Sequence, residues 1–115
     1  MLRGERFNYQ FEGDWKVVNP DAVLVGRAVT ATFMPGRPDL HAQIDKRGRD
    51  QGRSGSQNSW PVDMLKPGDV YVADQFDIYE DGPTVGDNLA NAILGNSGNG
   101  FVYYGPIRDI AGMKK

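Results

Sequence analysis

The feature that most constrains the fold is the order of two strand-like runs and one helix-like run between residues 65 and 105. Residues Val70–Phe76 follow the turn signature Lys66–Asp69 and predict a buried strand, because they are rich in apolar and aromatic side chains. Residues 100–104 read Gly-Phe-Val-Tyr-Tyr, are closed by Gly105 and Pro106, and predict another strand.

A short helix is expected between these two strands. Leu89, Ala92 and Ile93 recur at the i, i+3, i+4 spacing of one helix face, and Gly95 is the expected end of the helix. A strand, a helix and a strand in this order indicate a βαβ unit with neighbouring parallel strands. The sequence therefore predicts an α/β fold.

The residues before this unit predict a further strand, and one segment among them fits either a helix or a loop. Ala22–Met34 is rich in Val, Thr and Ala, and it predicts a long strand or two strands that meet at a bulge near Gly26. Residues 39–53 are polar and rich in arginine, so they fit either a helix that begins after Pro38 or a loop broken by glycines. Residues 57–65 gather apolar side chains around a proline and predict a short helix.

Length and composition restrict the class of protein. A chain of 115 residues is expected to form one domain. Thirteen Lys and Arg against fifteen Asp and Glu give a net charge of −2, which lacks the basic excess typical of nucleic-acid binding, so no nucleic-acid partner is expected. The absence of cysteine excludes disulfides, thiolate metal ligands and a cysteine nucleophile, and the single histidine, His41, excludes a site built on two imidazoles.

The hydropathy pattern gives no sign of a membrane segment. No apolar run approaches the ~18 residues of a membrane-spanning helix. The first fifteen residues carry charges throughout and lack the apolar segment of a secretory signal. We therefore expect no membrane partner and a cytoplasmic location.

The start of the expected helix, Gly86–Leu89, is the first candidate binding site. A glycine there lets a ligand approach the backbone closely, and the first amides of a helix are unpaired and favour an anion. A small carboxylate or phosphate would be held by the amides of residues 87–89. The simpler alternative is that Asp87 caps the helix, since aspartate is a preferred N-cap residue.

Arg108 and Asp109 form the second candidate site, just past the last expected strand. Ligands of α/β proteins bind in the crevice at the carboxyl ends of parallel strands. Arginine offers a planar fork to a carboxylate, and aspartate is a hard oxygen ligand suited to Mg²⁺. An exposed Arg-Asp pair on a loop is the alternative interpretation.

Two further polar stretches carry less specific patterns. The basic residues between 46 and 53 are interspersed with Asp45 and Asp50, so they are typical of a solvated loop. His41 is expected to be a loop or surface imidazole. The acidic residues of the run 72–82 would suit a cation, but their spacing does not match an EF-hand loop.

Four blocks of the sequence together resemble the RraA-like family. They are residues 25–39, 65–74, 86–105 and 107–109, which occur in the family order within residues 9–110. The family includes 4-hydroxy-4-methyl-2-oxoglutarate aldolases, oxaloacetate decarboxylases and the regulator of ribonuclease E activity. The resemblance implies a layered α/β sandwich of the swivelling-domain-like type. Residues 1–115 are then expected to form a single such domain that is truncated at the C-terminus. Relatives often start earlier with a helix, so a truncation at the N-terminus is left open.

The resemblance also implies roles for particular residues. The loop and helix start that hold the carboxylate of pyruvate correspond to Gly86, Asp87, Asn88 and Leu89. Arg108 corresponds to the arginine that binds the substrate carboxylate or enolate oxygen. Asp109 corresponds to the aspartate that coordinates Mg²⁺ or another divalent cation such as Mn²⁺. Where catalytic relatives often carry an acidic residue, this chain has Gly112, which leaves proton handling open.

These correspondences predict a divalent-metal-dependent lyase that acts on a small 2-oxo acid through a metal-stabilised enolate. The reaction would be a retro-aldol cleavage that releases pyruvate, as in class II aldolases, or the decarboxylation of oxaloacetate. The alternative is a non-catalytic regulatory protein that binds a ribonuclease or another protein partner. Asp109 favours the enzyme, because regulator-type relatives tend to lose that aspartate. The resemblance further implies a homotrimer or homohexamer with sites at subunit interfaces.

Overall fold

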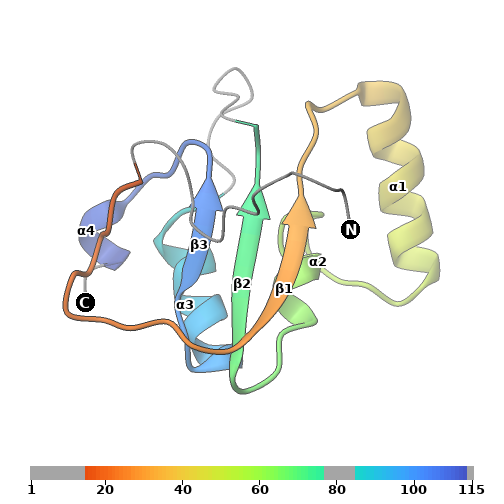
Figure 1. The fold of residues 1–115 in the computed structure, drawn as a ribbon. Helices are drawn as coiled ribbons and strands as arrows, with labels where there is room; N and C mark the ends of the chain where they lie inside the picture. Colours follow the sequence, from red (N-terminus) through yellow and green to blue (C-terminus); the bar gives the residue numbers. More distant parts are fainter. Residues whose placement is uncertain (1–14, 77–84, 114–115) are drawn as a thin grey trace, which may run out of the picture.

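A three-stranded parallel sheet organises the computed structural model, which describes residues 15–76 and 85–113. The strands are β1 (Arg27–Thr32), β2 (Asp69–Asp74) and β3 (Phe101–Tyr104), and β2 lies between the other two (Figure 1). All three point the same way, so their carboxyl ends share the upper edge of the sheet in Figure 1. The predicted α/β fold with neighbouring parallel strands is confirmed.

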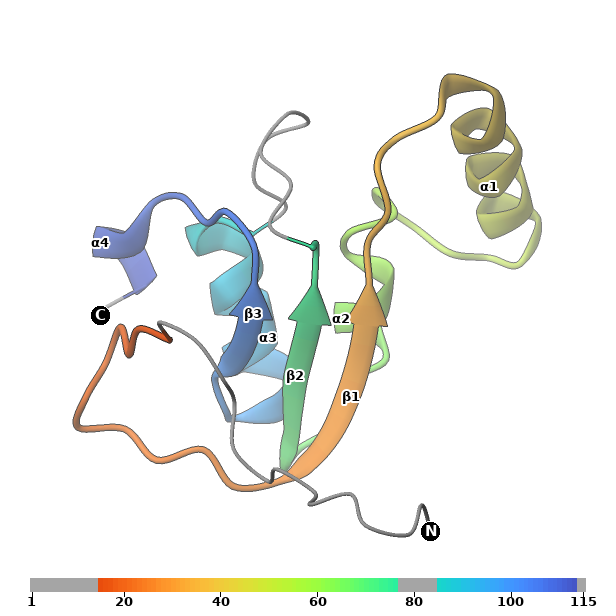
Figure 2. The same cartoon turned by 45° about the horizontal axis from the view of Figure 1, so that its top comes forward.

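The core lies between one face of the sheet and two helices. Helices α2 (Trp60–Asp63) and α3 (Asp87–Ser97) run behind the sheet in the view of Figure 1 and again in the tilted view of Figure 2. In register, Val29 pairs with Tyr71 and Tyr71 with Phe101, so these side chains share one face, and all three pack in the core. The buried residues at its centre are Val62, Leu65, Tyr71, Ala73 and Ile93.

An ion pair joins the amino ends of β1 and β2. Arg27 donates from Nε and Nη2 to the two carboxylate oxygens of Asp69, each at 3.0 Å, and the backbone N–H of Lys66 donates to Asp69 Oδ2 at 2.8 Å. The Arg27 guanidinium, followed by the Lys66 amide, holds the pKa of the Asp69 carboxyl below its usual range. The buried carboxylate of Asp69 therefore fixes the turn before β2 to the start of β1.

The first strand is shorter than the sequence predicts. Residues 22–26 lie outside β1, which begins at Arg27, so neither the long strand nor the pair of strands is present. A Cβ at Gly26 would collide with the carbonyl oxygen of Gly68. The chain needs glycine there to pass close to the turn before β2, and this close approach replaces the expected bulge.

Of the two alternatives for residues 39–53, a helix or a loop, the structure has the helix for most of the segment. Helix α1 (Pro38–Asp50) begins with a proline, which fits the first turn because it has no N–H to leave unpaired. Gly48 does not break the helix. It is buried because the indole ring of Trp60 packs against it, and a Cβ at Gly48 would overlap two ring carbons. Figures 1 and 2 show α1 standing beside the edge of the sheet rather than across its face.

Helix α3 confirms the predicted helix, with two corrections. It runs past Gly95 and ends at Ser97, because Gly98 adopts a left-handed backbone (φ +72°) that stops the helix. Ile93 is fully buried and Leu89 packs against the core, but Ala92 is exposed. The short helix predicted within residues 57–65 is confirmed as α2.

The segment that precedes β1 contacts the other face of the sheet. The Trp15 ring lies 5.9 Å from the Tyr104 ring, centroid to centroid, and Leu24 lies next to Gly100. A last short helix, α4 (Ile110–Met113), packs beside α3. Among the helices of the described parts, none has the length and apolar character needed to cross a lipid bilayer.

Candidate functional site

The start of α3 meets the segment that follows β3 at the carboxyl edge of the sheet. Val85 and Ile107 form an isolated parallel bridge, and the backbone N–H of Arg108 donates to the Val85 carbonyl oxygen at 3.2 Å. This bridge continues the strand pairing beyond β3 and places residue 108 directly beside residue 86. The two candidate sites of the sequence are thus one site in the structure.

Gly86 is the N-cap residue of α3, and its missing side chain makes this arrangement possible. A Cβ at Gly86 would lie 3.1 Å from Arg108 Nε and 3.1 Å from Asp109 Oδ2. Any larger residue would therefore crowd the two charged groups that lie over the helix start. Asp87 is the first helical residue rather than the cap, and α3 has no side-chain cap, so the interpretation of Asp87 as an N-cap is wrong.

Arg108 and Asp109 present their charges to solvent beside this glycine. Arg108 Nε lies 3.6 Å from Asp109 Oδ2, and the two side chains are 67% and 53% exposed. Asp109 has a left-handed backbone (φ +58°), which is uncommon for a residue with a side chain. Such conformations concentrate at binding sites, where the surroundings hold them. Here the N–H of Gly112 donates to the Asp109 carbonyl oxygen at 2.9 Å.

Gly112 lies against Asp87, a contact that the sequence pattern did not reveal. A Cβ at Gly112 would lie 2.7 Å from Asp87 Cβ and 2.9 Å from Asp87 Oδ2. An acidic side chain at position 112 would press on the carboxylate of Asp87. Glycine at position 112 thus allows α4 to approach α3 more closely than a residue with a side chain would.

The helix start offers hydrogen-bond donors toward the same place. The N–H of Ala90 is the first to bond within α3, to the Gly86 carbonyl oxygen at 3.0 Å. By helix geometry, the amides of residues 87–89 have no acceptor within the helix. Asn88 is exposed, whereas the side chain of Leu89 packs against the core, so Leu89 can contribute only its backbone.

The carboxylate of Asp109 suits a hard cation that takes few of its ligands from the protein. Within residues 15–76 and 85–113, no group of three or more His, Cys, Asp or Glu side chains comes together. Mg²⁺ commonly keeps several waters and binds through one or two carboxylates, so an exposed carboxylate such as that of Asp109 fits it. In the acidic run, Asp74 Oδ1 accepts the N–H of Phe76 at 2.7 Å, and the other acidic residues lie outside the described part.

Sequence reasoning missed a second polar group on α1. His41 Nε2 lies 3.3 Å from Asp45 Oδ2, and Gln57 Nε2 donates to Asp45 Oδ1 at 2.8 Å. His41 is exposed, as expected, but it is a helix residue with a defined partner. The i, i+4 spacing of His41 and Asp45 was the available signal, and it needed the helix to be predicted first.

The structure thus combines a parallel α/β sheet with a helix start, an arginine and an aspartate that lie together at its carboxyl edge. A family model described as RraA-like (Aldolase/RraA) matches residues 3–115, and the chain belongs to the RraA-like family. That family includes metal-dependent aldolases as well as regulators. No match was found among curated proteins or solved structures.

Proposed function

We propose that this protein is a divalent-metal-dependent lyase that cleaves a carbon–carbon bond of a small 2-oxo acid. The observation that carries the proposal is the convergence of Gly86, Arg108 and Asp109 at the start of α3. The reaction is a retro-aldol cleavage that yields pyruvate or the decarboxylation of oxaloacetate. Both need the same thing from the protein, which is stabilisation of negative charge on the 2-oxo oxygen as the bond breaks.

The helix start binds the substrate carboxylate. The amides of residues 87–89 point out of α3, and the helix dipole favours a negative charge beside them. Gly86 leaves the backbone open to close approach on that side. These donors are part of the rigid backbone, so they are already placed when the substrate arrives.

Arg108 orients the substrate. Its guanidinium is exposed and lies over Gly86, so its planar fork can donate hydrogen bonds to two oxygens of the bound 2-oxo acid. Asp109 lies beside it and keeps the guanidinium on this side of the site through their 3.6 Å contact.

Asp109 also holds the divalent cation, with water completing the coordination. The cation, when bound, supplies Lewis-acid stabilisation of the charge that develops on the substrate oxygen, so no Schiff-base lysine is needed. Among the described residues, the carboxylate of Asp109 is the one that forms an ion pair with Arg108. A homotrimer or homohexamer would add groups from a neighbouring subunit to this open site.

The test is titration of oxalate, a flat enolate mimic, into the protein with Mg²⁺, together with an assay of oxaloacetate decarboxylation. Arg108→Lys keeps the charge but loses the fork, and is expected to weaken oxalate binding by ~10- to 100-fold, since hydrogen bonds to charged groups contribute about 1.5–3 kcal/mol. Asp109→Asn is expected to remove the dependence on Mg²⁺. Arg37→Lys is the matched control, because Arg37 pairs with Asp39 far from α3.

The lyase proposal is wrong if the parent protein with Mg²⁺ shows no heat of oxalate binding and does not decarboxylate oxaloacetate. Retained folding together with that result favours the alternative, a non-catalytic regulatory protein that binds a ribonuclease or another protein. An effect of Arg37→Lys equal to that of Arg108→Lys would show that the loss is not specific to the site at the start of α3.

A further inference from the structure

A polar cleft lies between α1 and the loop that follows it, away from the start of α3. Its volume is about 380 Å³, and its walls include Arg49 from the helix and Arg53, Ser54 and Trp60 from the loop and α2. A second, more open hollow of about 620 Å³ adjoins it along α1 and shares His41, Asp45 and Arg49. Volumes of this size are typical of small-molecule sites, which span roughly 300–1,000 Å³.

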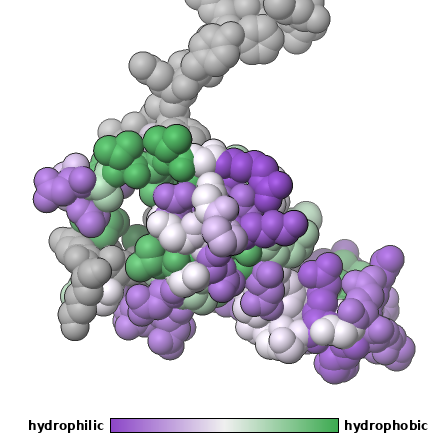
Figure 3. Space-filling model, turned by 90° about the horizontal axis from the view of Figure 1, so that it is seen from below, coloured by the Kyte–Doolittle hydropathy of each residue, from purple (hydrophilic) through white to green (hydrophobic). Residues whose placement is uncertain are grey.

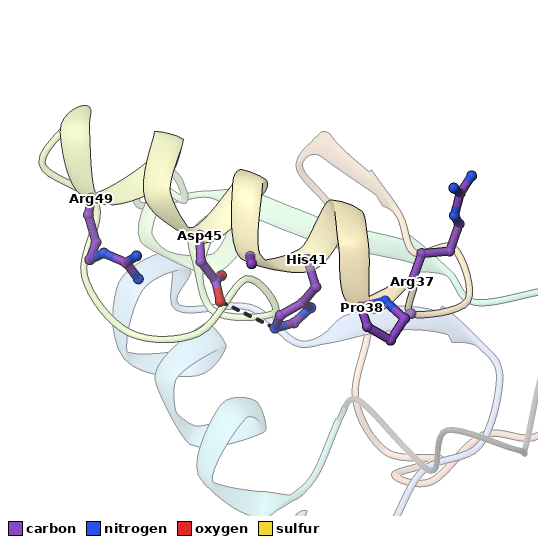
Figure 4. Close-up of a pocket in the computed structure, with 7 residues that line it drawn as sticks. Arg37, Pro38, His41, Asp45 and Arg49 are labelled. Atoms are coloured by element: carbon purple, nitrogen blue, oxygen red, sulfur yellow. Dashed lines mark ion pairs between the residues drawn. The ribbon is translucent and has the colours of Figure 1, made fainter.

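The side chains of α1 that line the cleft project from one side of the helix. Figure 4 shows His41, Asp45 and Arg49 on that side, whereas Arg37 points away from them. Their spacing of four residues keeps them on one face, one turn apart. In Figure 3, which shows the molecule from below, hydrophilic side chains cover much of the side that carries α1, and others lie elsewhere on this face.

Two arginines in this cleft lack acidic partners, unlike two nearby cations on or beside α1. Arg37 pairs with Asp39 and Lys46 with Asp50, each at 2.8 Å. By contrast, neither Arg49 nor Arg53 forms an ion pair within the described parts of the chain. Arg53 instead stacks over the Trp60 ring, with its guanidinium carbon 5.6 Å from the ring centroid, which fixes its charge at the cleft.

The one carboxylate in the cleft is already engaged. Asp45 faces the His41 imidazole through one oxygen and accepts from Gln57 through the other. Within the described parts of the chain, Asp45 forms no ion pair with Arg49 or Arg53. With two arginines and one aspartate among its lining residues, the cleft has one excess positive charge and two guanidinium groups that no acidic side chain pairs.

The loop wall adds neutral donors. In residues 15–76 and 85–113, no acceptor is placed for the backbone N–H groups of Ser54, Gly55 and Ser56 or for the Ser54 hydroxyl. Gly52 and Gly55 adopt left-handed backbones (φ +76° and +72°), so the loop curls back toward α1 and Trp60. The Trp60 Nε1–H donates to the Ser54 carbonyl oxygen at 3.1 Å, which fixes that curl.

We propose that this cleft binds a small molecule that bears a phosphate monoester. Arg49 and Arg53 have no acidic partner in the described residues, so both guanidinium groups can donate to the oxygens of one phosphate. A phosphate monoester carries nearly two negative charges at neutral pH, which strengthens these hydrogen bonds. Its oxygens accept in several directions, which suits donors that come from a helix on one wall and a loop on the other. A carboxylate accepts in one plane, so it can reach fewer of these donors at once. The site is separate from the start of α3 and does not depend on the proposed lyase activity.

The test uses inorganic phosphate and glycerol phosphate as probes, with succinate, a dicarboxylate dianion, for comparison. Binding is followed by calorimetry and by the amide chemical shifts of residues 54–56 in the full chain. Arg49→Gln is expected to weaken binding of both phosphate probes by ~10- to 100-fold. Arg47→Gln is the matched control, because Arg47 is on the same helix and lines neither hollow. Ser54→Ala, which leaves the charge and the Trp60 contacts unchanged, is expected to weaken binding by several-fold.

Saturable phosphate binding that depends on Arg49 and not on Arg47 supports the proposal. Absence of binding to the parent protein, or an equal loss in both arginine variants, overturns it. Succinate binding as tight as that of glycerol phosphate, with the same dependence on Arg49, also overturns the assignment to phosphate.

Discussion

The sheet with α2 and α3 and the neighbouring helix α1 are held by different forces. In the sheet region, Tyr71, Val85 and Ile93 are completely buried. In α1, thirteen residues long, Gly48 is the one buried residue, and Leu40 and Ile44 remain 42% and 44% exposed. The first region is stabilised by the burial of apolar surface, and the second by one aromatic contact and a few polar ones.

This difference implies two levels of stability within one chain. The apolar core couples β1, β2, β3, α2 and α3, so these elements are expected to unfold together. Helix α1 is anchored by the Gly48–Trp60 contact and by the Gln57–Asp45 hydrogen bond, so it can open locally at lower cost in free energy. The proposed lyase site belongs to the first region and the phosphate cleft to the second.

The largest effect is expected from a cavity in the core. Ile93→Ala should lower the free energy of unfolding by about 2–5 kcal/mol, because Ile93 is fully buried between α3 and the sheet. Urea denaturation followed by circular dichroism measures this change. Leu94→Ala is the control on the same helix, since Leu94 is 52% exposed, and its effect should be much smaller. Equal losses from both variants would mean that α3 is not anchored by a core.

A smaller effect is expected at the contact that anchors α1. Gly48→Ala would force a methyl group into the Trp60 ring, so the helix should withdraw from the ring at a cost of about 1–3 kcal/mol. Hydrogen exchange in α1 should accelerate while the amides of β2 keep their protection. Gly95→Ala is the matched control, because nothing lies within 4 Å of a Cβ at Gly95. It should stabilise α3 by about 0.5–1 kcal/mol. If the amides of the whole sheet also exchanged faster in Gly48→Ala, the idea that α1 opens independently of the sheet would be contradicted.

The smallest effect is expected from acid. The pKa of Asp69 is lowered in the folded protein, so its ion pair with Arg27 stabilises the fold above the unfolded-state pKa, about 3.9. That contribution should be lost as the pH falls from about 4 through the lower pKa of the folded state. Thermal unfolding of the parent and Asp69→Asn proteins between pH 7 and pH 2 measures it. The difference between the two melting temperatures should shrink on acidification, and a constant difference would contradict the role of this ion pair.

The sheet could be predicted from local patterns because each strand is short, apolar and bounded by turn residues. The turn at Lys66–Asp69 and the glycine before β3 mark the limits of β2 and β3 to within about two residues. The end of α3 could not be predicted as well, because Gly95 and Gly98 carry the same residue type. Only the left-handed backbone at Gly98 distinguishes the true end.

The candidate site was predictable in its residues but not in its geometry. The sequence by itself determined which groups are present: a glycine before a helix, an arginine and an aspartate after a strand. Only the tertiary structure decided that they meet, because the Val85–Ile107 bridge sets the register between segments more than twenty residues apart. The same holds for Gly48 and Trp60, and for Gly112 and Asp87. A glycine's role depends on what occupies the space beside it, and that space is defined only when distant elements pack.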